Sequence, residues 1–473
     1  MLFPTLNFAI FFLVVFTASW LLMPHRTAWK WFMLAASWYF YANWDWRFVA
    51  LIAGSSLVNQ IFGVAISRTD EPGRRKALVT GAVATNLAVL GVFKYYGFFA
   101  ESVADMLGTV GVESPIPFLR FILPVGISFL TFHAISYVVD IYRGDLAPAP
   151  ALDFFVYMAF FPHLVAGPIV RGSELLPQFR TKRNPRKIEA SLAFWLIMAG
   201  LAKKIVIADF LATNIVDGVF ATPGRFSAGE VLAGLYGYAV QIYCDFSAYT
   251  DIAIGVALLL GFHFPENFNS PYAATSIQDF WRRWHITLSR WLRDYLYIPL
   301  GGSRGSQTAT YRNLMLTMLL GGLWHGAAWN FVFWGGLHGA WLVWERRRAD
   351  RRTDQGLEPL PDTPGRRLVR RIITLNLVIF AWIFFRADSM STAFQILGRL
   401  TDWGPAPAVT PAILLAIAVG IGAQYVPRDF VVRLQAGFSR WAPAVQGLAL
   451  AVALVVIDSL GSQGVAAFIY FQF

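Results

Sequence analysis

Cysteine is almost absent from this chain: Cys244 is the only one among 473 residues. No intrachain disulfide and no cysteine-rich metal site can therefore form. Cysteine is more often a small buried hydrophobe than a nucleophile, so we do not expect Cys244 to carry an acyl-thiol step. The seven histidines are scattered, with no HxxxH or HExxH spacing. Because a metal site needs three or four converging ligands, we predict none.

Charge is also scarce: charged residues make up 14% of the chain and hydrophobic residues 56%. Such a small polar surface cannot cover a soluble globule, so an all-α, polytopic membrane helical bundle is predicted. At about 20 residues per span, we expect about eleven to thirteen spanning helices. The apolar stretches are Leu6–Met23, Phe32–Ile66 with a polar break at Asn43–Arg47, Leu78–Val92, Phe121–Val139, Ala190–Ile215, Val231–Leu260, Leu314–Val343, Ile372–Phe385, Pro411–Val426 and Ala444–Ile457.

The net charge of +11 does not indicate nucleic acid, because the basic residues lie in short loops between apolar stretches. Positive-inside retention explains such loops, which we therefore expect on the cytoplasmic side. The first apolar stretch has no Lys or Arg ahead of it and no small-residue cleavage site behind it. It is interpreted as a retained helix and not as a signal peptide, and both termini are expected outside the cytoplasm.

No repeat or soluble-domain-sized segment appears, so residues 1–473 are expected to form a single membrane domain. Its longest polar connection contains a basic cytoplasmic linker at 346–371. One region, Gly261–Arg312, is too polar to cross lipid and too aromatic for a solvated loop. Irregular backbone at membrane depth is tolerated only inside protein or beside a water-filled cavity, so a re-entrant or interfacial segment is predicted there.

Within that region, DFWRRWHITLSRWLRDYLYIPL (279–300) has the periodicity of an amphipathic helix when its residues are placed at about 100° steps. Trp284, Leu288 and Trp291 share the apolar arc, whereas the arginines and His285 fall mostly opposite. An interfacial helix with tryptophan anchors and snorkelling arginines explains this pattern. It does not require His285.

The stretch GGLWHGAAWN (321–330) holds His325 between glycines. The spacings Gly322 to Gly326 and Gly335 to Gly339 are small-xxx-small patterns, which let helix backbones approach closely in lipid. An ionisable residue seated there is by default a functional candidate, although a core histidine with a satisfied hydrogen bond is the alternative. His338 lies thirteen residues from His325. On a continuous helix that is about 220° of rotation, so the two would not share a face.

Polar residues also recur in QIYCDFSAYTDIAIG (241–255), a stretch expected to span the membrane. They indicate either a polar cavity or hydrogen bonds between helices. The stretches PENFNSPY and PHLVAGPIVR are proline-containing turns that are expected to end helices. From the residues alone, an enzyme and a transporter stay equally open.

Seven ordered stretches together resemble the membrane-bound O-acyltransferase family, in its bacterial branch of alginate O-acetyltransferase membrane components. The resemblance runs from the first helix to the terminal FIYFQF. The stretches are LPVGISFLTFHAISYVVDIYRG, PHLVAGPIVR, QIYCDFSAYTDIAIG, NFNSPY, DFWRRWHITLSRWLRDYLYIPLGGSR, GLWHGAAWNFVFWGGLHG and FFRADSMSTAF.

The resemblance implies a helical bundle around a central tunnel, with His325 at the centre and His285 nearby as catalytic residues. His325 is the candidate base, since imidazole titrates near operating pH without perturbation. His285 would orient the acceptor or polarise the carbonyl, and arginines would hold an anionic donor. The other residues expected to bind substrate are Arg282, Arg283, Arg290, Gln241, Asp245, Asp251, Trp324 and Asn330.

The function implied is transfer of acetyl from a cytoplasmic donor, acetyl-CoA, across the bacterial inner membrane to an extracytoplasmic polysaccharide such as alginate. Acetylation of cellulose or peptidoglycan is an alternative acceptor choice, and a transporter or flippase of an acylated or lipid-linked intermediate is the alternative function. The partners expected are a periplasmic acetyltransferase, polysaccharide-export machinery and membrane lipid, with no nucleic acid. No bound cofactor is expected, and both termini would be periplasmic.

Overall fold

The structure is a computed structural model. It describes residues 1–112, 116–117, 119, 121–165, 167–358, 360–461 and 468–469. All regular secondary structure in these ranges is helical, as predicted. Internal contacts divide the chain into two compact units, residues 1–189 with 256–265 and residues 190–255 with 266–473. Only Phe468 and Ile469 of the terminal FIYFQF lie within the described residues.

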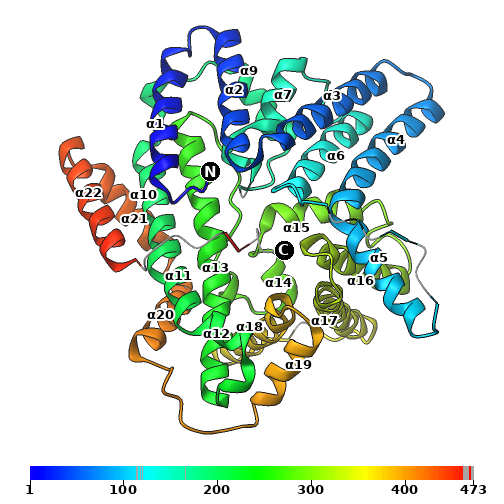
Figure 1. Cartoon of the computed structure of the whole chain (residues 1–473), viewed down its shortest axis with the longest axis vertical. Helices are drawn as coiled ribbons and strands as arrows, with labels where there is room; N and C mark the ends of the chain where they lie inside the picture. Colours follow the sequence, from blue (N-terminus) through cyan, green and yellow to red (C-terminus); the bar gives the residue numbers. More distant parts are fainter. Residues whose placement is uncertain are drawn as a thin grey trace. The chain divides into compact units, whose positions relative to one another are not determined.

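The first unit contains helices α1 to α9, all drawn in blue to cyan in Figure 1. A π-helical turn, η1, joins α4 to α5 without a break. The bounds are α1 (Leu6–Leu21), α2 (Arg26–Asp45), α3 (Arg47–Ser67), α4 (Pro72–Leu90), η1 (Gly91–Tyr95), α5 (Tyr96–Gly108), α6 (Ile127–Arg143), α7 (Ala151–Ala159), α8 (Phe161–Leu164), α9 (Gly172–Arg180) and η2 (Pro185–Lys187).

Buried amides link α3, α4 and α6, which pack side by side in this unit (Figure 1). Asn59 of α3 and Asn86 of α4 exchange two hydrogen bonds, of 3.1 and 2.7 Å. The Tyr137 hydroxyl of α6 donates to Gln60 Oε1 over 3.0 Å, and Gln60 Nε2 donates to the Ala149 carbonyl over 2.8 Å. Polar groups in an apolar interior must be paired in this way.

The second unit contains α10 to α12, most of α13 and the helices that follow it (Figure 1). Its helical bounds are α10 (Ala190–Leu201), η3 (Ala202–Ala208), α11 (Asp209–Leu211), η4 (Ala212–Val216), α12 (Asp217–Ala221), η5 (Pro223–Arg225), α13 (Ala228–Leu259), η6 (Pro271–Ala273), α14 (Ile277–Trp281), α15 (Ile286–Leu292), η7 (Arg293–Tyr297), α16 (Gln307–His325), α17 (Trp329–Asp354), α18 (Pro364–Arg386), α19 (Met390–Arg399), α20 (Pro411–Gly422), η8 (Ala423–Tyr425), α21 (Arg428–Ser439) and α22 (Pro443–Leu460).

Six helical segments among the described residues are long and apolar enough to cross a membrane, and the bent pair of α20 with α21, at 94°, would be a seventh. Hydropathy gives a larger helix count because it also includes stretches that form shorter helices, such as α1 with 16 residues and α6 with 17. The six segments are Arg47–Ser67, Pro72–Gly108, Ala190–Ala221, Ala228–Leu259, Pro364–Arg386 and Pro443–Leu460.

Helices α16 and α17 pack closely against each other at two of the glycines of the small-xxx-small patterns. A Cβ atom on Gly322 would lie 2.3 Å from the Phe331 carbonyl oxygen, and one on Gly335 would lie 2.3 Å from the Met318 carbonyl oxygen. No side chain fits in either place. The small-residue prediction is therefore confirmed for Gly322 and Gly335. It is not confirmed for Gly326, which lies outside both helices and faces the Phe331 side chain, and Gly339 faces the Met315 side chain first.

Two stretches that were predicted as continuous helices are interrupted in the structure, so both predictions are wrong. The apolar stretch Leu314–Val343 breaks between α16 and α17, at residues 326–328, where Gly326 adopts an extended backbone. The rotation argued between His325 and His338 therefore does not apply, because they lie on different helices. The single amphipathic helix over 279–300 is also wrong. It is divided into α14, α15 and η7, since His285 has a φ of 43° and cannot continue a right-handed helix.

The Asn59 and Asn86 pair gives a test of the first unit. We expect Asn59→Leu and Asn86→Leu each to lower the free energy of unfolding by about 1 to 3 kcal/mol, because each leaves the opposite amide oxygen buried without its donor. The double variant removes both amides and should cost less than the sum of the two singles. Unfolding in detergent, followed by circular dichroism, measures all three; strictly additive losses would contradict the pairing.

Candidate functional site

His325 is the last residue of α16 and lies buried in a cage of aromatic rings. Its ring centroid is 5.0 Å from that of Trp324, 5.1 Å from Trp334 and 5.2 Å from Phe385. The last two rings belong to α17 and α18, so three helices supply the cage. Because His325 is almost fully buried, its imidazole interacts electrostatically with neighbouring protein groups and bound substrate more strongly than it would in water.

His285 is fully buried in the turn between α14 and α15. Its φ of 43° and ψ of 56° place it in the left-handed region, which is uncommon for a residue with a side chain. Such strain gathers at functional sites and persists only where surrounding contacts hold it. Burial lowers the pKa of His285 to about 3, so its imidazole is neutral near pH 7.

Asn267 supplies the contacts that hold this turn. Its side-chain oxygen Oδ1 lies 3.1 Å from His285 Nδ1. The same oxygen accepts hydrogen bonds from the backbone N–H of Thr287, over 3.1 Å, and from the Thr287 hydroxyl, over 2.8 Å. The backbone N–H of Ile286 donates to the Asn267 carbonyl over 2.9 Å. Asn267 of the PENFNSPY stretch thus holds the start of α15 by hydrogen bonds. Asn267 and His285 are 18 residues apart, so the periodicity of the sequence could not predict this contact.

The two histidines belong to one aromatic cluster. The Trp324 ring centroid lies 6.2 Å from that of His285 and 5.0 Å from that of His325. Trp334, which packs against His325, also packs against His338 at 4.8 Å. His338 Nδ1 accepts a hydrogen bond from Trp281 Nε1 over 3.3 Å. Trp324 therefore joins the two predicted catalytic residues.

The predicted arginines differ in their surroundings. Arg282 and Arg290 are exposed, whereas Arg283 is half-buried. Arg283 Nε forms an ion pair with Asp279 Oδ1 at 2.8 Å within the turn of α14. Its guanidinium is thus engaged in local structure, while the other two remain accessible to an anionic group.

The predicted carboxylates of α13 are paired with lysines that sequence reasoning missed. Lys204, in the π-helical η3, lies 2.8 Å from Asp209 and 2.7 Å from Asp245, and all three are buried. Asp245 also accepts a 2.8 Å hydrogen bond from the backbone N–H of Ile469 near the C-terminus. Asp251 pairs with Lys203 at 2.5 Å. The sequence held one signal for these pairs: two adjacent lysines, Lys203 and Lys204, lie inside an apolar stretch where each would need an acidic partner.

Two further residues predicted to bind substrate, Gln241 and Asn330, lie on α13 and α17 of the second unit. Gln241 is half-buried on α13, with its Oε1 atom inside the protein and without a hydrogen-bond partner among the described residues. Asn330, on α17, donates through Nδ2 to the carbonyls of Phe384, over 3.2 Å, and Ala387, over 2.7 Å. It therefore ties the start of α17 to the end of α18 close to the His325 cage.

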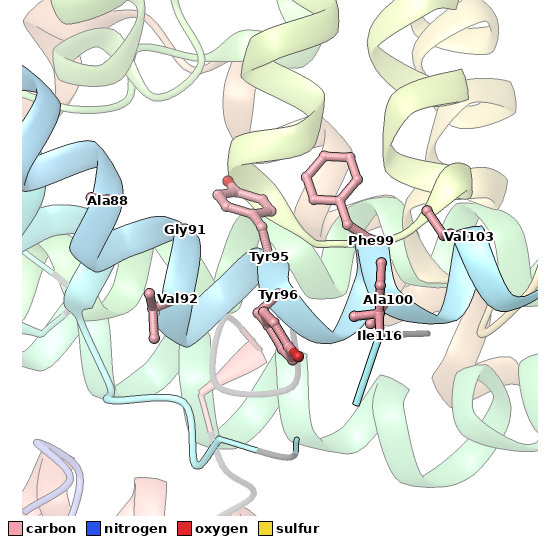
Figure 2. Close-up of a pocket in the computed structure, with 9 residues that line it drawn as sticks. All are labelled: Ala88, Gly91, Val92, Tyr95, Tyr96, Phe99, Ala100, Val103 and Ile116. Atoms are coloured by element: carbon pink, nitrogen blue, oxygen red, sulfur yellow. The ribbon is translucent and has the colours of Figure 1, made fainter. Parts of the chain in front are cut away.

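A hollow of about 450 Å³ lies in the first unit, along α4, η1 and α5. Figure 2 shows the rings of Tyr95, Tyr96 and Phe99 on its wall. Its lining residues are aliphatic or aromatic, with no histidine, carboxylate, lysine or arginine among them. Within the described part of the chain, no three His, Cys, Asp or Glu side chains gather as a metal ion would require. The candidate site is the histidine cluster of the second unit.

Comparison with known proteins shows the family to which the chain belongs. Residues 140–347 match the model of the membrane-bound O-acyltransferase family. The chain is 42% identical to the probable alginate O-acetylase of Pseudomonas aeruginosa, over 85% of this chain and 75% of that protein. This chain belongs to the membrane-bound O-acyltransferase family. It is therefore an acyltransferase and a multi-pass membrane protein.

Other relatives of this acyltransferase act on different polymers, according to their names. The peptidoglycan O-acetyltransferase of Helicobacter pylori is 38% identical over 78% of this chain and 73% of that protein. The teichoic acid D-alanyltransferase of Streptococcus thermophilus is 28% identical over 58% of this chain and 69% of that protein. Both names describe transfer of an acyl group, which is the chemistry that these proteins have in common with the acetylase.

The ion pairs of Lys204 with Asp209 and Asp245 can be tested by their contribution to the stability of this acyltransferase. We expect Lys204→Met to lower the free energy of unfolding by about 3 to 5 kcal/mol, because it leaves Asp209 and Asp245 buried without their shared cation. Lys203→Met is the matched control; its pair with Asp251 is partly exposed and should cost about 1 kcal/mol or less. Thermal unfolding in detergent measures both, and equal losses would contradict the buried triad.

Proposed function

We propose that this acyltransferase moves acetyl from cytoplasmic acetyl-CoA across the inner membrane for O-acetylation of an extracytoplasmic polysaccharide, with both termini on the periplasmic side. The observation that carries the proposal is His325, an imidazole seated in an aromatic cage at the end of α16, a helix that packs tightly against α17 at Gly322. An alginate-type acceptor is favoured because relatives named probable alginate O-acetylases are 42% identical over 85% of this chain.

In the proposed reaction His325 acts as general base. It takes the proton of an acceptor hydroxyl as the hydroxyl oxygen attacks the thioester carbonyl carbon. The carbon–sulfur bond then breaks, and the CoA thiolate leaves with the proton that the imidazolium returns. An imidazole serves both steps because its ordinary pKa lies near neutral pH.

The neighbouring residues have supporting roles in the proposal. His285 contacts the acceptor hydroxyl or the carbonyl, and Trp324 packs between them in the cluster. Arg282 and Arg290 are exposed cations that can hold the phosphates of the donor. A periplasmic acetyltransferase would complete the transfer beside the polysaccharide-export machinery, since the donor and the polymer lie on opposite sides of the membrane.

The test uses the purified protein in liposomes with radiolabelled acetyl-CoA and a hydroxyl acceptor or the periplasmic partner. Wild type should release free CoA when acceptor or partner is present. Both His325→Ala and His325→Gln should lower this rate by about 10² to 10⁴, the usual contribution of positioned proton transfer. His25→Ala removes an exposed histidine and should match wild type.

Two results would count against the proposal. Wild-type CoA release by both folded His325 variants would remove the base assignment. If wild type released no CoA yet moved an intact acetylated or glycosyl intermediate across the bilayer, the transporter alternative would replace acyl transfer. A transporter spreads its dependence over many cavity contacts, each worth about 1 to 3 kcal/mol.

A further inference from the structure

The amide of Asn267 has one accepting and one donating atom, and its neighbours identify them. A backbone N–H can only donate, so the Asn267 atom that lies 3.1 Å from the Thr287 nitrogen must be the oxygen Oδ1. The Thr287 hydroxyl, 2.8 Å from the same atom, is consistent with this orientation because it can donate.

His285 Nδ1 lies 3.1 Å from that same oxygen. Because an amide oxygen only accepts, Nδ1 must carry the proton, and a neutral imidazole has only one N–H. Nε2 therefore holds the lone pair. Building on the proposed function, we propose that Asn267 fixes this tautomer of His285, so that Nε2 can only accept a hydrogen bond from a donor group of the substrate other than the proton that His325 takes, and cannot polarise the thioester carbonyl.

The same residue also fixes the direction of the ring. The N–H groups of Ile286 and Thr287, the two residues after His285, donate to the Asn267 backbone and side-chain oxygens. They hold the left-handed backbone of His285 in place. The Phe246 ring packs at right angles against the imidazole, with 4.8 Å between centroids. Asn267 is therefore a positioning residue that acts on the substrate through His285.

Asn267 Nδ2 is buried and has no hydrogen-bond partner among the described residues. Replacing this amide nitrogen with oxygen therefore breaks no described bond. Asn267→Asp keeps an acceptor for Nδ1, whereas Asn267→Leu keeps the approximate volume and removes the acceptor. Asn269→Ala is the matched control, because Asn269 lies on the same turn with an exposed side chain.

The experiment records nitrogen NMR spectra of protein labelled with ¹⁵N-histidine, with His285→Gln identifying the His285 signals by their loss. Wild type should show a protonated Nδ1 and an unprotonated Nε2, and Asn267→Asp should keep Nδ1 protonated. Asn267→Leu should lose this signature. A protonated Nε2 in wild type would overturn the proposal directly, whatever the activity.

CoA release in liposomes completes the test. Asn267→Leu should lower the rate by about 10², the lower limit of what positioned proton transfer contributes, while Asn267→Asp should retain at least about a tenth of it and Asn269→Ala all of it. A folded Asn267→Leu protein with wild-type rate would overturn the positioning role. If wild type shows the Nδ1 tautomer but transfers no acetyl, the proposed function fails while the tautomer assignment stands.

Discussion

The contact between the backbones of α16 and α17 is the constraint on which the rest of the site depends. At Gly322 and Gly335 each helix meets a carbonyl oxygen of the other at a distance that excludes even a methyl group. Since lipid offers little hydrophobic drive for helices to associate, close packing of this kind supplies the association instead. It places the end of α16, and with it His325, against Trp334 of α17. The cage therefore depends on Gly322 and Gly335, because they allow the two helices to come this close.

A second constraint follows from the scarcity of water in such an interior. Three buried polar groups of the second unit are paired with other parts of the chain: Lys204 with Asp209 and Asp245, Asn330 with the end of α18, and His285 with Asn267. Unpaired groups of this kind would cost more than a typical bond contributes. The polar residues of α13 thus contribute helix-to-helix pairing, one of the two interpretations that their density allowed.

Composition and hydropathy predicted the helical class, and the glycine spacing predicted close helix packing at Gly322 and Gly335, because both depend on local pattern. The spacing did not predict that the two helices in contact come from one apolar stretch. The break between α2 and α3 also lies within the polar residues 43–47 that interrupt the hydropathy. Periodicity failed at His285, whose left-handed backbone is imposed by Asn267 from another part of the chain. The lysine partners of Asp245 and Asp251 were missed for the same reason, since long-range pairs leave no periodic signal. The motif residues His285 and His325 were found through family resemblance together with their cost in an apolar region.

Gly335 and Gly336 allow the most direct measurement of whether close helix packing places His325 for acyl transfer. A Cβ atom on Gly335 would meet the Met318 carbonyl oxygen at 2.3 Å, while one on Gly336 would meet only the Leu319 side chain at 3.6 Å, an ordinary contact. CoA release should therefore fall by about 10² in Gly335→Ala, because a displacement of about 1 Å is enough to cost that much, and should stay at the wild-type rate in Gly336→Ala. Circular dichroism should show unchanged helix content in both. A folded Gly335→Ala protein that releases CoA as fast as wild type would contradict the dependence of the site on this contact.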